Sequence, residues 1–183
     1  MSRLLPLTLI ILAQAYPLHA AIPEITEPES YEIYSHLIAA EIAAHWPMSV
    51  RVGVTRETQR GPLPMCIEPP PGQDALYRPM INDFEQRNAS RLALQPKLKL
   101  SSMYMWVDPK QTREFLADPK VPSVLFEVSA VGYNQDRTRA LVYVGHHCGR
   151  LCGSGMYYLL VQRAGRWELD SEYRGVPSCV WAS

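Results

Sequence analysis

The sequence predicts an α+β fold in which N-terminal helices pack on a C-terminal antiparallel meander sheet of about four to six strands. Apolar residues in segment 26–47 recur at helical spacing. Residues 123–173 then hold four extended apolar runs separated by short turns, and strands joined so closely run antiparallel. A last apolar stretch, 178–183, predicts an edge strand.

The first helix is expected over residues 26–47, where Thr26 or Ser30 can cap its start and Pro47 ends it. A repeat at i, i+3, i+4, i+7 and i+8 gives this helix one mostly apolar face. That face consists of Tyr34, Leu37, Ile38, Glu41 and Ile42.

Strand and helix patterns alternate between this helix and the C-terminal runs. Residues 48–55 and 98–108 each predict a strand. Segment 72–94 predicts a second helix that starts near Pro79, because proline suits a first helical turn better than an interior position. Residues 108–119 predict a short helix.

One C-terminal strand is apolar on both of its faces. Ala140, Val142 and Val144 share one face, and Leu141 and Tyr143 share the other. A sheet with one solvated face would alternate apolar and polar residues. Either the helices cover one side and the proline-rich loop covers the other, or the second face forms a homodimer.

The N-terminus has the pattern of a signal peptide. Arg3 precedes an apolar run at residues 4–12, and small residues allow cleavage after Ala15 or Ala20. The apolar run is shorter than the roughly 20 residues that a membrane-spanning helix needs. We therefore expect a periplasmic or secreted protein.

Residues 1–20 are taken as the signal peptide and residues 21–183 as a single α+β domain. The chain has 18 basic and 18 acidic residues, so without Arg3 the net charge is 17 − 18 = −1. No basic excess remains to neutralise phosphates, and nucleic acid is not an expected partner. No later segment is apolar enough to span a membrane.

The four cysteines are Cys66, Cys148, Cys152 and Cys179, and an even number in an exported protein predicts disulfides. Four cysteines allow three pairings. We favour Cys148–Cys152, which closes a very small loop flanked by glycines, together with Cys66–Cys179. By chain entropy the two bridges would stabilise the fold by about 2 and about 4–5 kcal/mol.

The stretch GHHCGRLCGSG, residues 145–155, concentrates reactive side chains. A metal site is disfavoured because His146 and His147, adjacent on a strand, point to opposite faces. A redox pair would need C-x-x-C at a helix start, whereas the spacing here is C-x3-C.

A nucleophilic serine is disfavoured too, because Ser154 lacks the G-x-S-x-G elbow and a strand follows it. The remaining functional hypothesis is a contact surface at the hairpin tip formed by His146, His147 and Arg150. Glu41 and His45, four residues apart on the first helix, are interpreted as a solvated pair rather than as an acid–base dyad.

The C-terminal motifs resemble those of a family of exported bacterial proteins to which no activity is attached. The family pattern is a valine-glycine-aromatic-asparagine turn, A-L-V-Y, C-G-x-L-C-G-x-G, Y-x-L-L, G-x-W and a terminal W-x-S. The matching segments here are 131–134, 140–143, 148–155, 157–160, 165–167 and 181–183. The resemblance implies an exported α+β domain and no particular chemistry. Helices followed by a curved sheet are also similar to cystatin-like or nuclear-transport-factor-like cones.

These observations favour a non-catalytic exported envelope domain that binds an unknown protein partner or small ligand, without a cofactor. The strands that are apolar on both faces and the lack of a catalytic constellation motivate this hypothesis. The alternatives are a periplasmic hydrolase that uses His146 or His147, and a metal-binding protein.

Overall fold

The computed structural model describes residues 22–47, 49–61, 68–69, 71–118, 121–149, 151–171 and 181–182. The predicted signal peptide, Cys66, Arg150 and Cys179 lie outside these residues. The described elements are α1 (Pro28–His45), β1 (Arg51–Thr55), α2 (Asp74–Arg87), β2 (Tyr104–Val107), the 3₁₀ turn η2 (Pro109–Gln111), α3 (Thr112–Leu116), β3 (Ser123–Val128), β4 (Gly132–Tyr133), β5 (Arg139–Gly149), β6 (Cys152–Arg163), β7 (Arg166–Leu169) and β8 (Trp181–Ala182).

The α+β class is confirmed, and one mixed sheet joins the eight described strands in the order β2-β1-β3-β5-β6-β7. Strand β4 pairs with β5, and β8 pairs with β6 as an added edge strand. The predicted C-terminal antiparallel meander is confirmed in β3, β5, β6 and β7. The predicted size is not, because β1 and β2 join these strands in a mixed sheet of eight described strands instead of about four to six. Strand β1 pairs in parallel with both β2 and β3. The connections after β1 and β2 contain helices, and such crossovers return the chain in the same direction.

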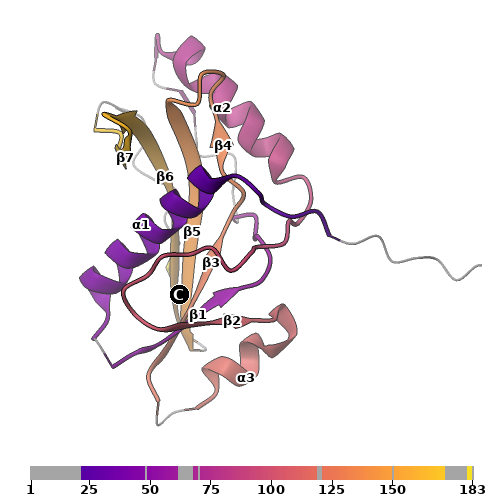
Figure 1. Cartoon of the computed structure of the whole chain (residues 1–183), viewed down its shortest axis with the longest axis vertical. Helices are drawn as coiled ribbons and strands as arrows, with labels where there is room; N and C mark the ends of the chain where they lie inside the picture. Colours follow the sequence, from indigo (N-terminus) through magenta and orange to yellow (C-terminus); the bar gives the residue numbers. More distant parts are fainter. Residues whose placement is uncertain are drawn as a thin grey trace, which may run out of the picture.

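Helices cover both faces of the central strands (Figure 1). On one face, α1 packs through Tyr34 and Ile38 against Val142 of β5. On the other face, α2 packs through Phe84 against Leu141. Apolar residues on both faces of β5 therefore need no second copy of the chain to cover them.

The shorter helix α3 covers the lower end of that second face, where Phe115 packs against Leu125 of β3. Residues 62–67 and 70 of the proline-rich loop lie outside the described residues. Gly61 at its start lies directly against the Tyr143 ring. Among the described residues, the second face is thus covered by α2 and α3, whereas the expectation assigned it to the proline-rich loop.

Two predicted helix starts are wrong. Helix α1 begins at Pro28 without a side-chain cap, and Ser30 lies inside it with its hydroxyl 3.0 Å from the Tyr133 hydroxyl. Helix α2 begins at Asp74, so Pro79 lies within the helix and not in its first turn. A proline this near the start removes only one backbone hydrogen bond, and the burial of flanking Tyr77 and Met80 offsets that loss.

Buried polar side chains connect α2 to the sheet. The Asn88 amide donates to the Phe84 and Ala130 carbonyls and accepts from the Ala130 N–H. The Tyr77 hydroxyl donates to Asp170, which also forms an ion pair with Arg139. Each group leaves water but gains a partner, which keeps the cost of its burial low. Among the described residues no helix is long and apolar enough to cross a membrane.

Candidate functional site

The sequence-predicted site lies at the tip of the β5–β6 hairpin. Gly149 pairs with Cys152 after a register shift that follows His147. Gly149 has φ +150°, a conformation that favours glycine. Cys148 and Cys152 form a disulfide with their Cα atoms 5.0 Å apart, as the sequence predicted.

The two histidines point to opposite faces of β5, as expected from their adjacency on a strand. His147 lies beside Leu125 on the α3 face, with its Nε2 3.3 Å from Oε2 of Glu127. The hydrogen bond to Glu127 raises the pKa of His147, and its partial burial opposes this. The predicted contact surface is therefore divided between two faces, and its third member, Arg150, lies outside the described residues.

His146 lies beneath α1 in a partly buried polar cluster. Its Nε2 is 3.2 Å from the Ser154 Oγ, and Ser154 is its partner across the β5–β6 ladder. Its Nδ1 is 3.8 Å from Oε2 of Glu41. Burial lowers the pKa of His146, and the nearby carboxylate only partly opposes this. The imidazole is therefore held in its neutral form at neutral pH.

Glu41 is the centre of this cluster. Its Oε1 accepts a hydrogen bond from the Tyr158 hydroxyl. Its Oε2 lies 3.8 Å from Nε2 of His45 as well as 3.8 Å from Nδ1 of His146. Burial raises the pKa of Tyr158, and the hydrogen bond to Glu41 adds to this, so the phenol keeps its proton. The side chain of Glu41 is only 16% exposed, so the Glu41–His45 pair does not lie on a solvated helix face as predicted.

Sequence reasoning missed this cluster because its members come from α1, β5 and β6. One signal was present: Glu41 occupies an apolar-face position in the helical repeat. A carboxylate on a face directed at the core needs polar partners, since an unpaired buried charge is costly.

Ser154, His146 and Glu41 stand in the order of a serine-nucleophile triad. That chemistry also needs N–H donors for the oxyanion. At Ser154, β6 is paired with β5 on one side and β8 on the other, which commits the backbone donors to the sheet. Among the described residues the cluster thus holds a base and its partner, while the backbone N–H groups at Ser154 belong to the sheet.

A cavity of about 680 Å³ lies between α3 and the hairpin tip, lined by Arg113, Leu116, Ala117 and Gly149. Arg113 is exposed and forms no ion pair with another described residue. A second cavity of the same volume lies between α1 and residues 96–99. There the hydroxyls of Tyr31 and Ser35 already accept hydrogen bonds from the N–H groups of Gln95 and Lys99.

No family model, curated protein or solved structure matches the chain. The likeness to a family of exported bacterial proteins and to cone-shaped folds therefore stays a prediction.

Proposed function

We propose that this chain is a non-catalytic exported domain that binds a ligand in the cavity between α3 and the β5–β6 hairpin. The cavity carries the proposal, because its volume of about 680 Å³ lies within the range of roughly 300–1,000 Å³ that is usual for small-molecule sites. Export is supported by the N-terminal signal pattern and by the Cys148–Cys152 disulfide, since disulfides persist in oxidising compartments.

The lining indicates the class of ligand. Leu116 and Ala117 offer apolar contact, and Arg113 offers the one cationic group among the described lining residues. A guanidinium pairs well with a carboxylate because its N–H groups form a planar fork. The arrangement suits an amphiphile with a short apolar body and a carboxylate, either as a free molecule or at the end of a peptide.

The cavity beside α1 suits this role less well. The hydroxyls of Tyr31 and Ser35 that line it are engaged in holding segment 95–99 against the helix. A ligand that used these hydroxyls would have to replace backbone hydrogen bonds. In contrast, the Arg113 side chain can reach a ligand without breaking an ion pair to another described residue.

Calorimetric titration with octanoate, and with octanol as the uncharged control, tests the proposal. Octanoate should bind, and Arg113→Gln should weaken it by about twofold to fivefold, the value of an exposed ion pair, while octanol binding stays unchanged. Ala117→Trp should weaken both by filling the cavity.

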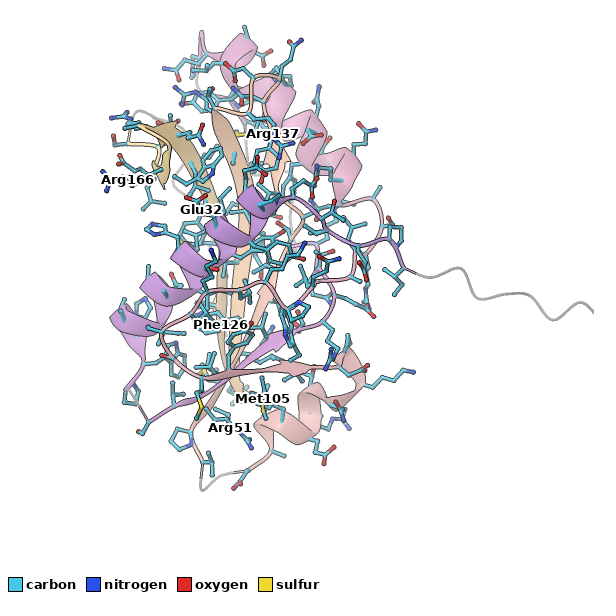
Figure 2. The ribbon with its side chains drawn as sticks, viewed as in Figure 1. Glu32, Arg51, Met105, Phe126, Arg137 and Arg166 are labelled. Atoms are coloured by element: carbon cyan, nitrogen blue, oxygen red, sulfur yellow. A yellow bond between two sulfur atoms is a disulfide. The ribbon has the colours of Figure 1, made fainter. Side chains whose placement is uncertain are left out.

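Arg166→Gln is the matched control, because Arg166 on β7 lies far from α3 (Figure 2). If neither amphiphile binds the wild-type protein, or if Arg166→Gln acts like Arg113→Gln, the site is not the one proposed.

A further inference from the structure

Strand β2 forms one edge of the mixed sheet and leaves part of its backbone unpaired. It stands at the end of the strand order, so no described strand lies on its outer side (Figure 1). We propose that this edge binds an extended acidic segment of a partner protein, which adds a strand to the sheet. This surface does not depend on the cavity at α3 or on the function proposed for that cavity.

The hydrogen bonds between β1 and β2 decide which backbone groups of β2 point outward. The N–H of Arg56, just after β1, donates to the carbonyl of Val107 at the end of β2. In a parallel pair, a residue directs both of its backbone groups to one neighbour, and the next residue directs them to the other side. Val107 therefore faces β1, whereas the N–H and C=O groups of Tyr104 and Trp106 point to the free edge. Each of these two residues offers one donor and one acceptor to an added strand.

The side chains at the β2 edge do not protect it against pairing. Edge strands that stay unpaired commonly carry charged residues or proline. Here the exposed side chains are apolar: Met103, just before β2, is 95% exposed, and Met105 is 48% exposed. The opposite edge of the sheet, β7, exposes Arg166 and Glu168 instead. Of these two edges, β2 is therefore the one suited to a further strand.

Positive charge around the β2 edge selects an acidic segment. Arg56 and Lys110 are exposed at the end where β2 passes into the 3₁₀ turn η2. Arg51, two residues before the β1 partner of Met105, lies on the same face as Met105 (Figure 2). None of these three cations forms an ion pair with another described residue. The carboxylate of Asp108 accepts a hydrogen bond from the Lys110 N–H and offsets only part of this charge.

A second copy of the chain fits this edge less well. Antiparallel pairing of two β2 strands would use the same backbone groups, but it would bring the positive charges of both copies together. On the neighbouring helix α3 the charges of Arg113 and Glu114 offset each other, so α3 supplies no acidic surface for a second copy. An acidic segment gains charge complementarity in addition to the backbone hydrogen bonds.

Fluorescence anisotropy with a labelled octapeptide in which valine and glutamate alternate tests the proposal. This peptide should bind the wild-type protein, and the matching valine–lysine peptide should bind about tenfold more weakly or worse. A valine–glutamate peptide with every backbone nitrogen methylated should lose as much, because each lost hydrogen bond weakens binding by about twofold to tenfold. Amide exchange of Tyr104 and Trp106 should slow when the valine–glutamate peptide is bound.

Met105→Glu is the decisive variant, because it places a negative charge at the edge on a side chain that is already half exposed. It should weaken binding of the valine–glutamate peptide by about tenfold or more. Leu169→Glu, which adds the same charge at an exposed position of β7, is the matched control and should bind like the wild type. No binding to the wild type, undiminished binding of the methylated peptide, or an equal loss in Leu169→Glu overturns the proposal. A wild-type dimer in sedimentation that Met105→Glu converts to a monomer also overturns it, because β2 then binds a second copy.

Discussion

The Cys148–Cys152 disulfide closes the β5–β6 tip, and its loss should have a measurable cost. The bridge joins residues separated by 4 in sequence, so it closes a loop of about five residues. The chain-entropy relation for such a loop gives about 2 kcal/mol of stabilisation. For a domain of this size, 1 kcal/mol corresponds to roughly 2–4 °C, so Cys148→Ser/Cys152→Ser should lower Tm by about 4–8 °C.

Urea and thermal unfolding under non-reducing conditions measure this difference. Amide exchange should also accelerate near the tip, around residues 145–155, more than in the centre of β5. Adding a reductant to the double variant is the control, because any further change then arises from the remaining cysteines. A loss below about 0.5 kcal/mol would refute the reasoning, since it would mean that the unfolded chain gains little freedom when the bridge is removed.

Two further predictions concern packing and pH. Gly132→Ala should destabilise the fold by about 1–3 kcal/mol, because a Cβ there would lie 2.5 Å from backbone atoms of Phe84 in α2. Thermal unfolding measures this loss, and an unchanged Tm would contradict the close packing. Burial alone would raise the pKa of Glu27, but the hydrogen bond and charge of Arg87 outweigh burial and lower that pKa. The Glu27–Arg87 pair therefore stabilises the fold above the unfolded pKa of about 4.3. This stabilisation is lost as the pH falls through the lower pKa of the folded state. In Glu27→Gln the free energy of unfolding should therefore fall less steeply below about pH 5, by less than about 1 kcal/mol. Unfolding measured across acid pH checks this, and parallel curves for the wild type and the variant would contradict the assignment.

The local predictions succeeded where neighbouring residues control the structure. The helical repeat around Leu37 predicted α1, and the closely spaced runs predicted the β3–β7 region. Adjacency on a strand was enough to predict that His146 and His147 face opposite sides. The small loop between Cys148 and Cys152 was enough to predict their disulfide.

The predictions failed where a distant segment outweighed a local preference. Pro79 disfavours a helix interior, yet burial of Tyr77 and Met80 extends α2 past it. Strand β1 looked like an ordinary N-terminal strand, and nothing in its residues indicated that it would lie between β2 and β3 in parallel.

By itself, the sequence determined the α+β class, the positions of most elements and the tight hairpin tip, because periodicity, turn length and short loops act over a few residues. Only the tertiary structure placed Glu41 against His146, residues more than a hundred positions apart, by packing α1 across β5 and β6. The same packing decided that α2 and α3 cover the second face of the sheet. Such contacts depend on which surfaces are buried together, and that choice is made by the whole core.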